Sequence, residues 1–201
     1  MKHLISSLLA IFMLASTYSC TTANSKEANA AEEEVNASEV VVNNIMARRS
    51  IRKYKNDSVP RDILDKIIEG GINAPNGKNE QIYEVKVVSD TASTAFLSEQ
   101  LNGLYKAPVY LFIAAKSDYD MSLIDVGLLS ENICLSACAY GIGTINLGMP
   151  VRSLKEKPDI LAKLGFTEGY DICLILALGY ADESPEAKPR KADKVQFVSI
   201  K

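Results

Sequence analysis

The sequence has 201 residues, of which 47% are hydrophobic and 23% are charged, a composition typical of a globular protein with one core-forming domain. The formal net charge of −3 gives no broad positive field, which argues against nucleic acid or an anionic membrane surface as a general partner. Basic residues that bind anions must therefore act locally.

Residues 1–19 predict a signal peptide of the lipoprotein type. The start is positively charged, and the apolar run from Leu4 to Ala15 is too short to span a bilayer comfortably. The tetrapeptide that ends at Cys20 resembles a bacterial lipobox, in which the cysteine becomes lipidated. The alternative is an ordinary cleaved signal with an incidental Cys20. We expect an exported protein, lipid-anchored through Cys20 to a bacterial membrane on its periplasmic or cell-surface side.

Residues 20–39 predict a flexible tether, because they are rich in Ala, Asn, Ser and Glu and show no apolar periodicity. Residues 40–201 then form the folded domain. The one histidine, His3, would leave with the signal peptide. The mature chain then has no imidazole for a catalytic triad or a metal site.

The cysteines beyond Cys20 predict small buried hydrophobic residues. They follow no metal-ligand spacing, and their odd number argues against a disulfide framework: Cys134, Cys138 and Cys173. We therefore expect no metal site.

The first half of the domain predicts two helices followed by two strands. Residues 40–47 suit a short amphipathic helix, and a second helix begins at Pro60 and is weakened at Gly70-Gly71. Strands are expected at 83–88 and 109–115, the latter a continuous apolar run typical of a central strand. Residues 90–104 are interpreted as a thin connection.

The second half is dominated by a long apolar helix over residues 123–140, which predicts a buried central helix that ends at Gly141. Strands at 144–147 and 170–180, a surface helix at 158–164 and a terminal strand at 195–200 follow. This irregular mixture predicts an α+β fold.

A basic run gives the first functional signal. Arg48, Ser50 and Arg52 are spaced by two, with Arg49 between them, so an extended segment would direct all three side chains to one side. Two guanidinium groups and a hydroxyl suit a phosphate or an electron-rich carbonyl edge. The alternative is a solvated basic strand edge.

Two further segments add context. Asn79 follows turn-forming residues, and its amide can donate and accept hydrogen bonds at once, which matches the imide edge of an isoalloxazine ring. Lys188 and Arg190 place two more cations on an otherwise acidic chain. The alternative for the Asn79 segment is an ordinary polar turn.

Together these segments resemble the nitroreductase family of FMN-dependent oxidoreductases, over roughly residue 40 to the C-terminus. The resemblance is carried by motifs in the family's order: Arg48–Tyr54, Ala74–Tyr83, Ala107-Pro108, Asp125, Gly141 with Gly143, and Lys188 with Arg190. Two positions depart from the family pattern. Ile82 and Tyr83 replace Pro and Trp, and Leu147 stands where many members carry an acidic residue.

The resemblance implies a set of cofactor contacts. The FMN phosphate region would be held by Arg48, Ser50, Lys188 and Arg190. Arg49 also belongs to the expected cofactor-binding residues. Arg52 would lie near the pyrimidine side of the ring, and Asn79 would bond the ring or the ribityl chain. A backbone N–H around Leu147 and Gly148 would meet flavin N5, and the missing Cβ of Gly148 would allow close approach.

The resemblance also implies a nitroreductase-like fold with a central mixed or antiparallel sheet flanked by helices. It further implies a homodimer with FMN at the subunit interface, in which the terminal strand 195–200 is exchanged between subunits. The expected reaction is ping-pong electron transfer through FMN to nitroaromatic, quinone or similar acceptors, with no catalytic side chain. The donor would be NAD(P)H, or a quinol or protein partner if the chain is exported. The alternatives are a non-catalytic flavin-binding lipoprotein and, less well supported, a generic anion-binding domain.

Overall fold

The computed structural model describes residues 36–201, which belong to one compact unit, Val35–Lys201. The expected signal peptide, Cys20 and most of the expected tether lie outside the described residues. The first helix begins at Ala37, within the expected tether, and Asn36 caps it by accepting a hydrogen bond from the Ser38 amide.

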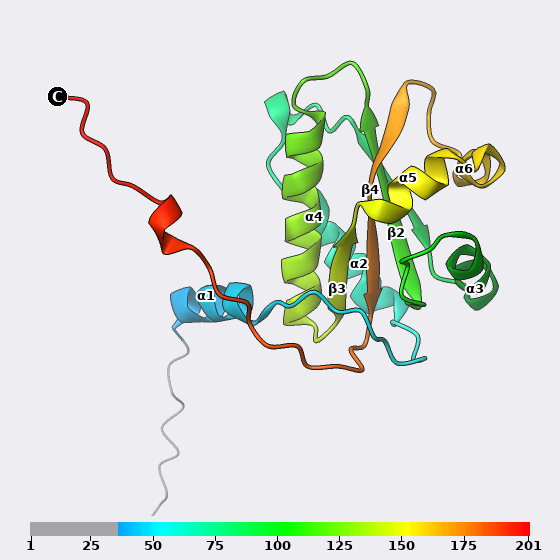
Figure 1. Ribbon diagram of the computed structural model, residues 1–201, viewed down its shortest axis with the longest axis horizontal. Coiled ribbons are helices and arrows are strands. Elements are labelled where there is room, and N and C mark those ends of the chain that lie inside the picture. Colours follow the sequence, from blue (N-terminus) through cyan, green and yellow to red (C-terminus); the bar gives the residue numbers. More distant parts are fainter. Residues whose placement is uncertain (1–35) are drawn as a thin grey trace, which may run out of the picture. The chain divides into compact units, whose positions relative to one another are not determined.

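The described chain mixes helices and strands without regular alternation (Figure 1). The α-helices are α1 (Ala37–Ala47), α2 (Arg61–Ile72), α3 (Thr91–Gln100), α4 (Ser122–Ala139), α5 (Met149–Lys155) and α6 (Pro158–Leu164). The strands are β1 (Tyr83–Val88), β2 (Val109–Lys116), β3 (Gly143–Leu147) and β4 (Tyr170–Gly179), and short 3-10 turns occupy Gly77–Asn79 and Ala192–Lys194.

The strands form one sheet in the order β1-β2-β4-β3, and every neighbouring pair is antiparallel. The fold is therefore α+β, as the irregular order of elements predicted. β2 and β4 lie at the centre, which explains the continuous apolar run of β2, since helices cover both of its faces. β3 and β1 form the edges.

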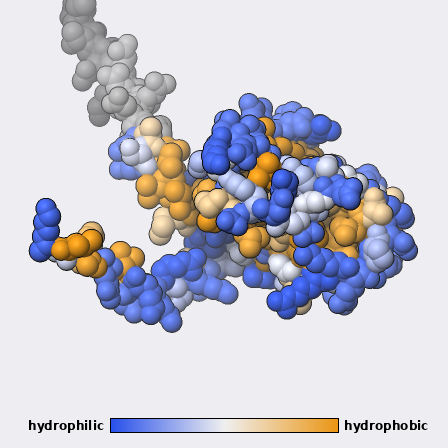
Figure 2. Space-filling view, turned by 90° about the horizontal axis from the view of Figure 1, so that it is seen from above, coloured by the Kyte–Doolittle hydropathy of each residue, from blue (hydrophilic) through white to orange (hydrophobic). Residues whose placement is uncertain are grey.

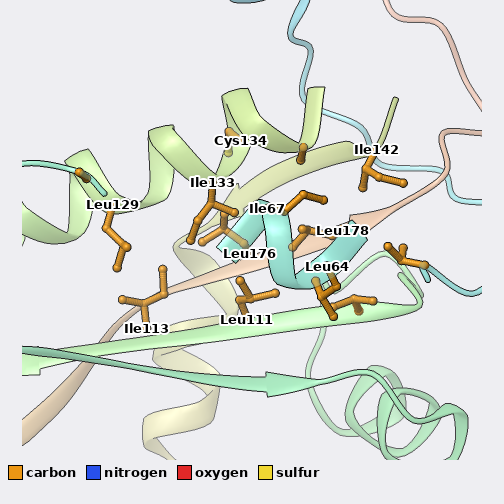
Figure 3. Packing of buried hydrophobic residues seen from close by; sticks show 14 of the residues in the cluster. Leu64, Ile67, Leu111, Ile113, Leu129, Ile133, Cys134, Ile142, Leu176 and Leu178 are labelled. Carbon is orange, nitrogen blue, oxygen red and sulfur yellow. The ribbon is translucent and has the colours of Figure 1, made fainter. Parts of the chain in front are cut away.

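Helices cover the two faces of the sheet in separate groups, with α2 and α4 on one face and α3, α5 and α6 on the other (Figure 1). Alternation along β2 divides its side chains between them, so that Leu111 and Ile113 pack under α4 while Tyr110 and Phe112 face α3. Figure 3 shows Leu111, Ile113 and the α4 residue Ile133 meeting in the first of these cores.

α4 is the buried central helix that its composition predicted. Within the described residues it is the one helix long and apolar enough to cross a membrane, and 44% of it is buried inside the protein. Its inner face packs on α2 and the sheet through Leu129, Ile133 and Ala137. This packing accounts for its apolar character as that of a core helix.

Gly70 and Gly71 allow close packing and do not end α2. A Cβ at Gly71 would come within 2.3 Å of Ile133 Cγ1, and one at Gly70 within 2.1 Å of Ser136 Oγ. The helix continues to Ile72. The two glycines thus set how closely α2 approaches α4.

Three local predictions differ from the structure. Residues 90–104 contain α3, capped by the Asp90 carboxylate on the Ser93 amide, and Met149–Lys155 forms the unpredicted helix α5. The terminal strand expected at 195–200 is wrong for the described chain, where these residues form no strand. A strand needs a neighbouring edge for its hydrogen bonds, and the C-terminal segment extends away from the sheet (Figure 1).

Candidate functional site

A basic pocket of about 320 Å³ lies where the end of α1, the segment after it, α4 and the C-terminal segment meet. It brings together six of the residues expected to bind the cofactor: Arg48, Arg49, Ser50, Arg52, Lys188 and Arg190. Ile45 and Met46 of α1 contribute an apolar wall, and Glu131 comes from α4. The two basic segments, far apart in sequence, thus line one cavity.

The charge inside the basic pocket is predominantly positive. Five cationic side chains line it against two carboxylates, those of Glu131 and Glu186. Arg48 Nε lies 3.5 Å from Glu131 Oε1. Among residues 36–201 the other four cations make no ion pair, and guanidinium groups of Arg49, Arg52 and Arg190 donate to nearby backbone carbonyls. Such donors can turn to an anionic ligand at little cost.

The basic run lies along the outer edge of β3. Ser50 forms a parallel bridge with Thr144, and the Ile51 amide donates to the Thr144 carbonyl over 2.9 Å. Ile51 is buried, and a Cβ at Gly143 would come within 2.7 Å of its Cγ1. Arg48, Ser50 and Arg52 therefore line the pocket from a short segment fixed by the sheet. Arg49 between them lines it too, so the spacing by two does not by itself explain which side chains reach the pocket.

Tyr54 anchors the far end of this segment. Its hydroxyl donates to the Ile51 carbonyl at 2.8 Å and reaches the Ala177 carbonyl at 3.3 Å. Burial raises the pKa of Tyr54 well above its ordinary value, and the nearby Tyr110 adds to the shift. The phenol therefore remains a neutral donor at physiological pH.

Glu183 ties the basic segment to the chain that follows β4. Its carboxylate accepts hydrogen bonds from the backbone amides of Arg52 and Lys53, the second at 3.1 Å. The Lys55 amide donates to the Tyr180 carbonyl nearby, over 2.9 Å. Glu183 thus helps to hold Arg52 where it lines the pocket.

Asn79 does not line the basic pocket. It lies on the loop Asn76–Gln81, which follows α2 and is fastened to the beginning of α4 through a hydrogen bond from the Gly77 amide to Asp125. Asn79 itself is exposed and has a positive φ of 57°. Different parts of α4 contact the loop and the basic pocket. Asp125 bonds the loop and Glu131 lines the pocket, and the two residues are about 9 Å apart along the helix axis.

Leu147 and Gly148 also lie outside the basic pocket, at the end of β3. The Leu147 side chain is buried in the core beside the sheet. At this position, the groups that can contact a ligand are therefore those of the backbone. A Cβ at Gly148 would meet no atom within 4 Å. Gly148 lies four residues beyond Thr144, roughly 13 Å at the usual rise of a strand.

Asn146 is a candidate that sequence reasoning missed. Because the Thr144 carbonyl bonds outward to Ile51, alternation directs the Asn146 backbone to the same open edge of β3. Its side chain is exposed, and its Oδ1 lies 3.8 Å from Cys134 Sγ. The signal was the alternation of polar Thr144 and Asn146 with buried neighbours in a short strand.

The cysteines of the described chain are free thiols. Cys134 is buried, and burial raises its pKa to about 11, which keeps it a thiol at neutral pH. Residues 36–201 contain no cluster of three or more His, Cys, Asp or Glu side chains that could hold a metal ion.

Comparison with known proteins extends the picture. Residues 40–200 match the family model described as "Putative TM nitroreductase". A "Putative NADH dehydrogenase/NAD(P)H nitroreductase" from Archaeoglobus fulgidus is 30% identical over 150 residues, which cover 71% of this chain and 86% of that protein.

Two solved structures share the fold. A nitroreductase with bound FMN from Bacteroides fragilis has a TM-score of 0.72 at 24% identity and covers 79% of this chain and 98% of its own. A nitroreductase with bound FMN from Desulfitobacterium hafniense has a TM-score of 0.71 at 26% identity, with the same coverage. The family match over most of the domain and the shared α+β architecture lead to one conclusion. The chain belongs to the nitroreductase family.

Proposed function

We propose that this protein is an FMN-dependent oxidoreductase that reduces conjugated, electron-poor acceptors such as nitroaromatics and quinones. The observation that carries the proposal is the basic pocket, in which two distant segments place five cations and the Ser50 hydroxyl around one cavity. Membership of the nitroreductase family supports it, as do the FMN-bound relatives of the same fold.

The residues present suit FMN by the chemistry of their donors. Arg48, Arg49, Ser50, Lys188 and Arg190 would hold the phosphate by charge-assisted hydrogen bonds. Arg52, which lines the same pocket, would favour negative charge on the ring, and Asn79 would bond the ring or ribityl chain. The open edge of β3 up to Gly148 would offer backbone groups to the ring. The chemistry that FMN supplies when bound is the transfer of two electrons from a donor to an acceptor.

The protein's part in this reaction is to bind, orient and charge-stabilise the cofactor, without a nucleophile or a general acid. The proposed donor is NAD(P)H, in keeping with the name of the Archaeoglobus fulgidus relative. If the chain is exported, a quinol or a protein partner would replace NAD(P)H, which is a cytoplasmic pool.

The test is an absorption spectrum of the protein purified without added flavin, followed by denaturation. We expect flavin bands and the release of about one FMN per subunit. A colourless protein that also fails to take up added FMN would reduce the family likeness to a likeness of fold. The alternative function, a flavin-binding protein without turnover, is separated by assays with NAD(P)H and with a chemical reductant against a panel of acceptors.

We further propose that the protein is a homodimer. Hydrophobic side chains remain exposed on α1, on the outer face of α4 and in the C-terminal segment, among them Val41, Ile124, Leu128, Phe197 and Ile200. Figure 2 shows hydrophobic atoms gathered on α1 and near the C-terminal end. Such unpartnered apolar surface is typical of an interface between subunits. The basic pocket borders it, since Ile45 and Met46 line the pocket.

Export and lipid anchoring at Cys20 remain a proposal that rests on the sequence from Leu4 to Cys20 alone. Radiolabelled palmitate should enter the wild-type protein and not Cys20→Ser, and the wild type should fractionate with membranes. Unlabelled protein in the cytoplasmic fraction would count against it.

A further inference from the structure

Asp125 is a buried carboxylate whose bonds are directed at one backbone group. Its side chain lies in the first turn of α4, and the residue is only 4% exposed. Both carboxylate oxygens accept from the Gly77 amide, at 3.1 and 3.2 Å. No cation among residues 36–201 lies within ion-pair distance of it. A buried charge is costly, so this arrangement calls for a role.

The loop that Asp125 holds has an unfavourable backbone. In Asn76–Gln81, three residues other than glycine have positive φ: Lys78 at 54°, Asn79 at 57° and Gln81 at 51°. A left-handed conformation costs each such residue on the order of 1 kcal/mol, somewhat less for asparagine. A loop of this kind persists only where the surrounding structure determines its shape.

Three contacts fix the loop in addition to its internal backbone bonds, in which the Asn79 amide donates to the Asn76 carbonyl and the Glu80 amide to the Gly77 carbonyl. Besides the bond to Asp125, the Asn76 side-chain oxygen accepts from the Gln81 amide at 2.9 Å. Gly77 lies against Tyr119, where a Cβ would come within 2.0 Å of the hydroxyl oxygen. Asp125 thus holds the loop from the α4 side, while any side chain at position 77 would require the Tyr119 ring to move aside.

We propose that Asp125 is a positioning residue for the flavin, acting through this loop. By binding the Gly77 amide it holds Asn79 in the left-handed conformation that presents the amide side chain to the cofactor. The inference rests on the proposed function, because it assigns Asn79 to the flavin. Asp125 does not touch the cofactor in this assignment.

The first variant is Asp125→Asn, with Asp65→Asn as the matched control. The neutral amide is a weaker acceptor for the Gly77 N–H, so FMN should bind about tenfold more weakly. Asp65 is an exposed carboxylate on α2 that pairs with Arg61 at 2.7 Å, and its replacement should leave FMN affinity unchanged. The measurement is the quenching of FMN fluorescence on titration with apoprotein.

A double-mutant cycle with Asn79→Ala separates positioning from a general structural role. If Asp125 acts through Asn79, the double variant should bind FMN about as weakly as the weaker single variant. Fully additive losses would overturn the proposal. Amide hydrogen exchange of the apoprotein adds a readout without flavin, and exchange over residues 76–81 should be faster in Asp125→Asn than in the wild type.

Two further outcomes keep this inference distinct from the proposed function. If the wild type and Asn79→Ala bind FMN equally well, the assignment of the loop to the flavin is overturned. The oxidoreductase proposal would still stand in that case. Wild type that binds no FMN would overturn both. If Asp125→Asn fails to fold, Asn76→Ala removes the bond from the Gln81 amide that closes the same loop, and it should weaken FMN binding and speed exchange in the same segment.

Discussion

At the scale of single residues, Arg48 joins several parts of the site. It follows α1 directly, lines the basic pocket and pairs with Glu131 of α4. Exposed ion pairs contribute little to stability, so the value of Arg48 lies in what it offers a ligand. The half-buried Tyr54 and the buried Cys134 have raised pKa values and serve as neutral structural groups beneath this surface.

We expect Arg48→Ala to weaken FMN binding by about 10- to 100-fold, because it removes a charge-assisted hydrogen bond worth roughly 1.5–3 kcal/mol. Arg61→Ala is the matched control, since Arg61 is an exposed arginine of α2 paired with Asp65. Its FMN affinity should equal that of the wild type. Isothermal titration with FMN measures both, and equal affinities for the two variants would refute the prediction.

Cys134 should make stability fall in alkaline solution. Burial raises its pKa from 9.0 to about 11, so the unfolded chain loses the proton first. The stability that the folded state gains by keeping this thiol protonated is therefore fully present below pH 9 and is lost as the pH rises towards 11. Urea unfolding under reducing conditions at pH 8, 9 and 10 should show a steeper loss for wild type than for Cys134→Ala. Parallel profiles would contradict this.

At the scale of elements, the site depends on how segments are held against each other. Glu183 fastens the basic segment through two backbone amides, and the glycines of α2 let that helix pack closely on α4. α4 in turn contacts both the Asn79 loop and Arg48. Small changes in these contacts should therefore reach the site without touching a ligand.

Glu183→Ala and Glu186→Ala should change FMN affinity in opposite directions. Removing Glu183 frees the Arg52 segment, so affinity should fall by about fivefold even though a negative charge is lost. Glu186 lines the basic pocket, and removing its charge should tighten binding up to a few-fold. Titrations at one fixed salt concentration test both, and tighter binding by Glu183→Ala would show that charge alone governs the pocket.

Gly71→Ala should destabilise the fold by about 1–3 kcal/mol, because the added Cβ overpacks against Ile133. Gly127→Ala on α4 is the control, since a Cβ there meets nothing within 4 Å. It should stabilise the protein by up to about 1 kcal/mol through helix propensity. Urea denaturation measures both, and a stabilised Gly71→Ala would mean that α2 and α4 are free to move apart.

At the scale of the whole molecule, the C-terminal segment leaves its apolar residues unpartnered within one chain. Phe197 and Ile200 are 102% and 97% exposed. A segment that also carries Lys188 and Arg190 into the basic pocket would couple assembly to cofactor binding.

Deletion of residues 191–201 should therefore impair dimerisation and FMN retention together. The measurements are light scattering after size exclusion and the FMN content per subunit. Lys194→Ala in the full chain is the control, because it changes a charge and keeps every apolar residue of the segment. A truncated protein that remains dimeric would argue against this interface.

Local sequence determined much of the fold and part of the site. The apolar run of β2 and the apolar sequence of α4 each depend on nearby residues, and both predictions agree with the structure. The basic run is local too, and its residues Arg48, Ser50 and Arg52 line one pocket together with Arg49, while their contacts with a cofactor stay a prediction. Helix α3 was not predicted because its polar, small-residue sequence has little amphipathic periodicity. Its conformation is therefore decided by packing against the sheet.

Only tertiary structure could decide the rest. Residues 195–200 form no strand within one chain, because an alternating pattern needs an edge to pair with, and their exchange between subunits stays a prediction. The pairing of Asp125 with Gly77, the outward edge at Asn146 and the meeting of Arg48 with Arg190 join residues far apart in the chain. Such contacts form because burying one continuous core brings distant segments together, and no local propensity encodes which segments those are.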